Sequence, residues 1–149
     1  MNNTDTANRG FTLIEVLLSL GVIAILAGLS IPVAVNFQRS GQLAETALSV
    51  RQAYARAQVL SRNQINDTSW GVYADTTGVT IFQGTSYATR NPDYDEITPI
   101  SGVTVTGVTE LTFAQLSGTP STTGSTTLTN SIGDQILISI NEFGVVEVS

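Results

Sequence analysis

Residues 16–38 read VLLSLGVIAILAGLSIPVAVNFQ, a stretch of 23 residues that carries no charge and is flanked by Glu15 and Arg39. At a rise of about 1.5 Å per residue, a helix of this length spans the roughly 30 Å hydrocarbon layer of a membrane. The stretch exceeds the roughly 7–15 apolar residues of a secretory signal peptide, and no small-residue cleavage site follows it. We therefore predict a transmembrane helix that the mature protein retains.

The helix is predicted to continue beyond Arg39 with an amphipathic pattern. Apolar residues recur there at spacings of three and four, at Leu43, Ala47, Val50, Tyr54 and Ala57. Such a stripe is typical of a helix that buries one face against a sheet. Turn-forming residues at 63–69 end the pattern, so the helix is predicted over residues 11–62, up to about 78 Å long at about 1.5 Å per residue.

The rest of the chain predicts strands separated by turns. The expected strands are residues 70–74, 79–83, 103–106, 108–114, 135–140 and 145–148. The first two flank a turn at 75–78 in which Gly78 is expected to take a positive φ, and the last two flank a turn at 141–144. Residues 117–131, SGTPSTTGSTTLTNS, are predicted to form an exposed loop because they are too polar to enter a core; whether this loop is glycosylated stays open. The predicted fold class is α+β, a long N-terminal helix packed on a small antiparallel β-sheet head.

Composition excludes most catalytic chemistry. The sequence contains no cysteine and no histidine, and its six basic residues are all arginine. Disulfides, thiol nucleophiles, imidazole triads, Schiff bases and P-loops are therefore ruled out. We predict that the protein is not an enzyme and has no cofactor.

Charge is distributed unevenly along the chain. Residues 1–62 carry five arginines against three acids, whereas residues 63–149 carry one arginine against nine acids. Nucleic-acid affinity comes largely from Lys and Arg that displace counterions from the phosphates. Direct nucleic-acid binding by the acidic part is therefore not expected.

A carboxylate stands at the edge of the apolar stretch, in the sequence Gly10-Phe11-Thr12-Leu13-Ile14-Glu15. Placing a carboxylate at this depth in a membrane costs free energy, so Glu15 is a candidate functional residue. The alternative is that its side chain simply extends to the membrane interface. The short polar leader, Arg9-Gly10, the Phe, the Glu and the apolar helix, in this order, closely resemble the processing signal of type IV prepilins and pseudopilins. Pro32 falls where many members carry a helix-breaking proline.

The resemblance implies a role for each matching residue. A membrane-embedded prepilin peptidase would cut after Gly10 and methylate the new amino terminus at Phe11. Glu15 would pair with the amine of Phe11, in its own chain or in a neighbouring subunit, and so mark the register of the assembly. Pro32 removes a helical hydrogen bond to the carbonyl of Gly28. The resemblance implies that this turn melts on assembly. The alternative is a kink that a membrane helix tolerates.

The domain organisation follows from these roles. Residues 1–10 are the predicted leader, 11–38 the transmembrane and assembly helix, 39–62 its amphipathic half and 63–149 the β-rich head. The resemblance places the chain in the bacterial inner membrane as a single-pass protein with its head outside the cytoplasm, and then in a pilus or pseudopilus. Its implied partners are the prepilin peptidase, an assembly ATPase with its membrane platform, other pilin subunits through helix packing, and membrane lipid.

Within the family, the head is most similar to the H-type minor pseudopilins of type II secretion and to T-type minor pilins, on its Trp-Gly-Val-Tyr strand and its closing hairpin. A minor pilin or pseudopilin is favoured over a DNA-uptake receptor because the head is acidic. The rival hypothesis is a single-span anchor whose β-rich head binds a sugar or calcium and does not polymerise.

One acidic segment is a candidate calcium loop. Asp93, Asp95 and Glu96 place three carboxylates within four residues, and carboxylate oxygens are the ligands that calcium prefers. The spacing lacks the EF-hand pattern, so a solvated acidic loop is the favoured interpretation.

Overall fold

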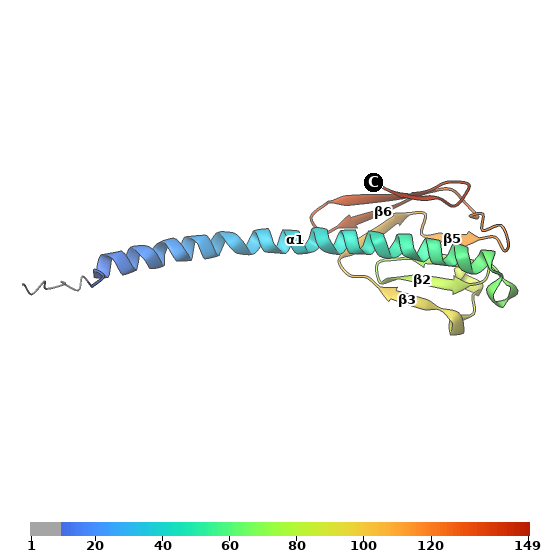
Figure 1. The fold of residues 1–149 in the computed structure, drawn as a ribbon, viewed down its shortest axis with the longest axis horizontal. Helices are drawn as coiled ribbons and strands as arrows, with labels where there is room; N and C mark the ends of the chain where they lie inside the picture. Colours follow the sequence, from blue (N-terminus) through green and yellow to red (C-terminus); the bar gives the residue numbers. More distant parts are fainter. Residues whose placement is uncertain (1–9) are drawn as a thin grey trace, which may run out of the picture. The chain divides into compact units, whose positions relative to one another are not determined.

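The computed structural model describes residues 10–149 and, for residues 29–34, the backbone alone. Its principal helix, α1 (Leu13–Arg62), is followed by a β-rich region (Figure 1). The chain divides into two compact units, Met1–Asn36 and Phe37–Ser149, and α1 contributes to both. The predicted α+β class and the predicted end of the helix at residue 62 are confirmed.

The elements after α1 are short. They are η1 (Ile65–Asp67), β1 (Trp70–Ala74), β2 (Gly78–Gln83), η2 (Tyr87–Thr89), η3 (Pro92–Tyr94), β3 (Glu96–Pro99), β4 (Val103–Gly107), β5 (Glu110–Phe113), β6 (Gly124–Asn130), β7 (Gln135–Ile140) and β8 (Val146–Val148). They form two four-stranded antiparallel sheets, ordered β3-β2-β1-β5 and β4-β6-β7-β8, where the sequence predicted one small sheet. The predicted hairpins β1–β2 and β7–β8 are both present.

The core of the second unit lies where one face of α1 meets both sheets. The five residues of the predicted helix stripe are all buried, as the spacing indicated. They cluster with Val72 and Leu111 of one sheet and with Leu128 and Ile138 of the other. Figure 1 shows α1 running along both sheets in this unit. Because both sheets are closed by the same helix face, this helix half and the head form one folded body.

The prediction that residues 117–131 form an exposed loop is wrong for their second half. Residues 124–130 form β6, which lies between β4 and β7, and Thr126, Leu128 and Asn130 of this strand are buried. Threonine is β-branched and suits a strand. Its hydroxyl is also satisfied inside, since Thr126 Oγ1 donates to the carbonyl of Val108 at 2.5 Å. Buried polar groups are tolerated when they are hydrogen-bonded.

Two glycines fix the chain path in the head. Gly107 ends β4 at φ +88°, a conformation that favours glycine, and its Cα lies against the backbone of Ser125. Gly78 does not take the predicted positive φ; instead, a Cβ there would lie 3.1 Å from the carbonyl oxygen of Thr98 in β3. The turn before it is held by Asp75 Oδ1, which accepts from the amides of Thr77 and Gly78 at 2.7 and 3.0 Å.

Candidate functional site

The described chain begins at the predicted processing site. Gly10 and Phe11 precede the helix and are exposed, Phe11 to 82%. A Cβ added to Gly10 would meet no atom within 4 Å, so nothing in the described chain covers this peptide bond. A protease that binds its substrate as an extended chain would reach the Gly10–Phe11 bond without unwinding α1.

Glu15 lies in the first turn of α1. Its amide donates to Thr12 Oγ1 at 3.3 Å and to the Thr12 carbonyl at 3.1 Å, so Thr12 caps the helix. The spacing Thr12-x-x-Glu15 is that of a capping box, and a carboxylate in a first turn also complements the helix dipole. The sequence analysis does not assign this capping role to Thr12, although the spacing Thr12-x-x-Glu15 indicates it. Glu15 therefore has a local function in the helix start beside its predicted role in assembly.

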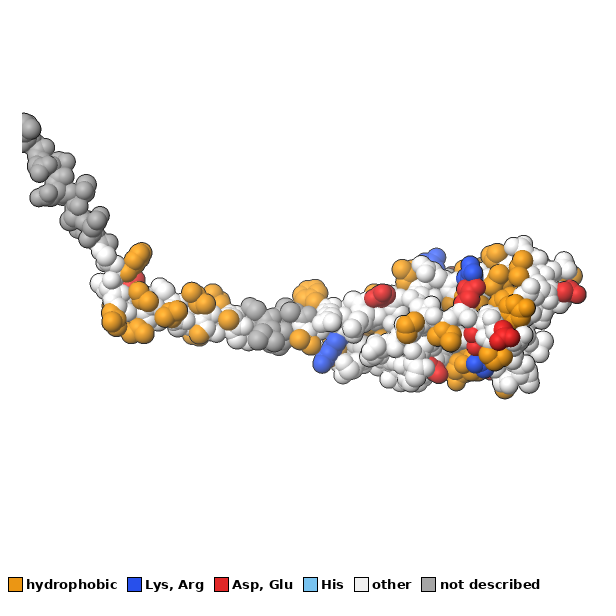
Figure 2. All heavy atoms as spheres, turned by 90° about the horizontal axis from the view of Figure 1, so that it is seen from below, with side chains coloured by type: hydrophobic (Ala, Val, Ile, Leu, Met, Phe, Trp, Pro, Cys, Tyr) orange, Lys and Arg blue, Asp and Glu red, His pale blue; other side chains and the backbone are white. Residues whose placement is uncertain are grey.

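The N-terminal part of α1 exposes its large apolar side chains. More than two fifths of the surface is exposed for each of Leu13, Ile14, Val16, Leu17, Leu18, Leu20, Val22, Ile23 and Ile25. Figure 2 shows these hydrophobic side chains along the N-terminal part of the helix. Soluble domains rarely expose a contiguous apolar surface of this kind unless a membrane or another protein covers it. Among the described residues, however, no helix meets the length and hydropathy expected of a membrane span.

The predicted weak turn lies within α1. The backbone is helical from Gly28 to Pro32, so the helix continues through both positions. A Cβ on Gly28, or on Gly21 two turns earlier, would meet no atom within 4 Å. The side chain of Pro32 lies outside the described residues, and melting of this turn on assembly stays a prediction.

The acidic segment of the head does not collect its carboxylates at one point. Asp95 accepts from Arg90 Nε at 2.8 Å, whereas Glu96 forms a two-bond ion pair with Arg56 at 2.5 and 2.6 Å. Asp93 is exposed. No group of three acidic side chains suited to a metal ion occurs in residues 10–149 as described. Asp95 Oδ1 is buried without a hydrogen-bond partner in that part of the chain, and a single oxygen of this kind is not the ligand set that a calcium loop needs.

The acidic partner raises the pKa of the arginine in each of these pairs. The hydrogen bond and charge of Glu96 raise the pKa of the Arg56 guanidinium, and the hydrogen bond from Arg90 to Asp95 raises the pKa of Arg90. Arg90 also stacks on the ring of Tyr87, with Cζ 3.7 Å from the centroid. The Arg56–Glu96 pair joins the 87–96 segment to α1, and the contacts of Arg90 hold this segment together, which is a structural role.

Comparison with known proteins identifies the N-terminal segment. A family model described as the prokaryotic N-terminal methylation motif matches residues 5–31. No curated protein and no solved structure was found to match the chain. The motif implies processing by a prepilin peptidase, membrane anchoring and assembly with other pilin subunits, and it indicates a structural subunit rather than an enzyme. The chain thus carries the N-terminal methylation motif at residues 5–31, consistent with the type IV pilin and pseudopilin family.

Proposed function

We propose that this protein is a structural subunit of a type IV pilus or of a type II secretion pseudopilus. The observation that carries the proposal is the arrangement at the start of α1: an uncovered Gly10–Phe11 bond, a capped helix start at Thr12 and an exposed apolar segment behind it. A plain membrane anchor has no use for the first of these features, whereas a subunit that is processed and then polymerised uses all three.

Processing would take place at the exposed bond. The peptidase hydrolyses the peptide between Gly10 and Phe11, which leaves a carboxylate on the leader and a new amine on Phe11 that is then methylated. The leader, residues 1–10, lies almost entirely outside the described residues. Because the bond precedes the helix by two residues, cleavage would leave the Thr12 cap intact.

After cleavage, residues 16–38 would anchor the subunit as a single span in the inner membrane, with the head outside the cytoplasm. An assembly ATPase and its membrane platform would then move the subunit from the lipid into the filament. There Glu15 would pair with the methylated amine of Phe11 of a neighbouring subunit. Two opposite charges that are desolvated together cost far less than one alone, so the pair favours one alignment of adjacent helices.

The acidic head favours a minor pilin or pseudopilin over a DNA-uptake receptor. In the head, Arg90 is held by Asp95, and a net negative surface repels phosphates. The choice between a pilus and a secretion pseudopilus is made by the experiment that follows.

The test is the intact mass and N-terminal sequence of the native protein, taken separately from sheared filaments and from membranes. A chain that begins at methylated Phe11 and is enriched in sheared filaments supports a pilus subunit, and a processed chain in small amounts in the membrane supports a pseudopilin or minor subunit. A chain that still begins at Met1, or is cut elsewhere, overturns the proposal and favours the anchored binding module. A Gly10→Leu variant is the matched control, since a large residue before the bond should block cleavage and leave the head folded.

A further inference from the structure

We propose that the side of α1 that faces away from the head's core, over residues 37–59, is the docking surface for the β7–β8 turn of a second copy of this chain. The inference rests on the proposed function, since it takes the chain to assemble with like subunits. Both surfaces lie in the unit Phe37–Ser149, so each belongs to the same folded body.

The helix carries a second stripe, which the head does not cover. Its residues recur at spacings of three, four and seven and are Phe37, Gly41, Ala44, Leu48, Ala55 and Val59, called the outer stripe below. Such spacings place residues on one side of a helix. Phe37, Leu48 and Val59 are 77%, 51% and 54% exposed, whereas the predicted core stripe on the other side is buried. The helix therefore has two apolar sides, and its own head occupies one.

Gly41, a small residue of the outer stripe, packs against no other part of the described chain. A Cβ on Gly41 would meet no atom within 4 Å among the described residues, yet glycine in a helix costs roughly 1 kcal/mol relative to alanine. Small residues between large apolar ones let another chain approach the helix backbone closely. Gly41 is thus explained by a partner outside the chain.

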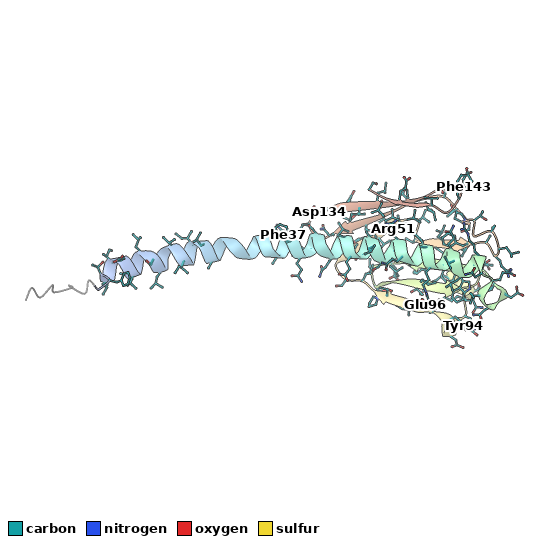
Figure 3. All side chains as sticks on the ribbon, in the orientation of Figure 1. Phe37, Arg51, Tyr94, Glu96, Asp134 and Phe143 are labelled. Atoms are coloured by element: carbon teal, nitrogen blue, oxygen red, sulfur yellow. The ribbon has the colours of Figure 1, made fainter. Side chains whose placement is uncertain are left out.

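One unpaired cation lies beside this stripe. Arg51 is exposed, and its guanidinium has no ion pair or hydrogen bond within the described residues. Figure 3 shows Arg51 on α1, on the same helix as Phe37. The neighbouring arginines differ, because Arg56 pairs with Glu96 and Arg62 donates to the carbonyl of Ser117. The outer stripe therefore offers a positive charge in its middle.

The turn between β7 and β8 has the complementary chemistry. Phe143 is 69% exposed, and Glu142 and Glu147 are exposed carboxylates with no partner in the described chain. Figure 3 shows Phe143 at the end of this hairpin. We call Glu142, Phe143, Val145 and Glu147 the hairpin end.

The hairpin end is held rigidly. Asn141 Oδ1 accepts from the amides of Phe143 and Val145, both at 3.0 Å, and Gly144 takes φ +77°. The carbonyl of Phe143 accepts from Gln58 Nε2 at 3.3 Å, which ties the turn to the helix. An exposed aromatic side chain on a fixed backbone loses little conformational freedom on binding and is typical of an anchor residue.

These two surfaces fit each other in charge and polarity. The apolar part, Phe143 against Leu48 and the neighbouring Ala44, would supply most of the affinity, and Arg51 facing Glu142 and Glu147 would select the orientation. The two surfaces are different, so the contact is heterologous, and a heterologous contact that does not close into a ring propagates as a filament. A second copy of the chain satisfies both surfaces at once, and consecutive copies are the consequence.

The sequence has no cysteine, which makes disulfide trapping clean. A full-length chain with Ala44→Cys and a differently tagged chain with Val145→Cys are produced together and oxidised in the membrane, so that Leu48 and Phe143 keep their side chains. We expect a mixed disulfide that carries both tags. The matched control replaces Val145→Cys by Thr104→Cys, an exposed position on β4, and should give no mixed disulfide.

Charge reversal tests the orientation. Arg51→Glu in the Ala44→Cys chain should lower the yield of mixed disulfide roughly tenfold, because repulsion replaces attraction at the contact. Glu142→Arg with Glu147→Arg in the Val145→Cys chain should restore it. Asp93→Arg, a reversal of the third unpaired head carboxylate, should not restore it.

Absence of the mixed disulfide overturns the docking proposal. A yield of mixed disulfide that is the same with Arg51 and with Arg51→Glu overturns it as well. Trapping of the Ala44→Cys chain on a different protein also overturns it, because the occupant is then another partner. The N-terminal residue of the same samples separates the two proposals. A chain that begins at Phe11 without the mixed disulfide refutes only the docking, whereas a chain that begins at Met1 refutes the proposed function.

Discussion

The polar contact between α1 and β6 predicts a measurable coupling in stability. Thr126 Oγ1 lies 3.0 Å from Tyr54 Oη and donates to the carbonyl of Val108 at 2.5 Å. A threonine hydroxyl has one hydrogen, so Tyr54 must be the donor to Thr126. Both side chains are 2% exposed, and water therefore cannot replace a lost partner.

The magnitudes follow from which groups each variant leaves unpaired. Tyr54→Phe removes one donor and leaves the Thr126 bond to Val108 in place, so we expect a loss of about 1 kcal/mol in the free energy of unfolding. Thr126→Val keeps the shape and leaves the buried Tyr54 hydroxyl and the half-buried Val108 carbonyl without partners, for a loss of about 3 kcal/mol. In the double variant only the carbonyl is unpaired, and the expected loss is about 2 kcal/mol, roughly 2 less than the sum of the two single losses.

The assay is denaturant unfolding of the full chain in detergent, followed by the fluorescence of Trp70, the sole tryptophan of the sequence. Thr127→Val is the matched control, because Thr127 is the next residue of β6, is only partly buried and has no side-chain hydrogen bond to a buried group. We expect it to change stability by less than about 0.5 kcal/mol. A Thr126→Val loss no larger than this control, or a coupling near zero, would refute the reasoning.

The same contact predicts a dependence on alkaline pH. Burial raises the pKa of the Tyr54 phenol above its ordinary value near 10. The unfolded chain therefore loses this proton at a lower pH than the folded chain, so stability is full below about pH 10 and falls as the pH rises towards the folded pKa. Unfolding midpoints measured between about pH 8 and 11.5 should fall less steeply for Tyr54→Phe than for the wild type. Equal slopes would contradict the assignment.

Two further predictions concern the ends of α1. Ser61→Ala removes the buried hydroxyl that accepts from the Trp70 amide at 2.8 Å, and should lower stability by about 2 kcal/mol, whereas Ser49→Ala on the same helix should be near neutral in the same unfolding assay. Glu15→Ala should leave cleavage intact, because the bond before Phe11 stays exposed, but should reduce recovery in sheared filaments; normal recovery would refute the pairing with the new amine.

The helix and its core face could be predicted because they depend on local pattern. The stripe from Leu43 to Ala57 repeats with the period of a helix, and each of its predicted members is buried. The helix also ends at Arg62, just before the turn-forming residues. A local period and a local stop signal need no knowledge of the rest of the chain.

The second sheet could not be predicted in the same way. The polar strand β6 enters the core because Thr126 and Asn130 find partners there: Val108 for the former, and the amides of Ile132 and Asp134 for the latter. Val108 comes from another segment of the chain, so composition alone indicated a loop. Likewise Gly107 separates two strands that belong to different sheets, and nothing local distinguishes this corner from an ordinary hairpin turn.

The two candidate sites differ in how far they depend on the folded structure. A peptidase acts on a short exposed segment, so the residues that it recognises are adjacent in sequence and a linear motif reports them, as the match at residues 5–31 does. A docking surface exists only after folding, because the outer stripe is defined by which side of α1 the head already covers. Arg56 pairs with Glu96 of its own head, whereas Arg51, the cation beside this stripe, has no such acidic partner among the described residues. The processing site is therefore readable from the sequence, and the surface that we propose for assembly required the folded head.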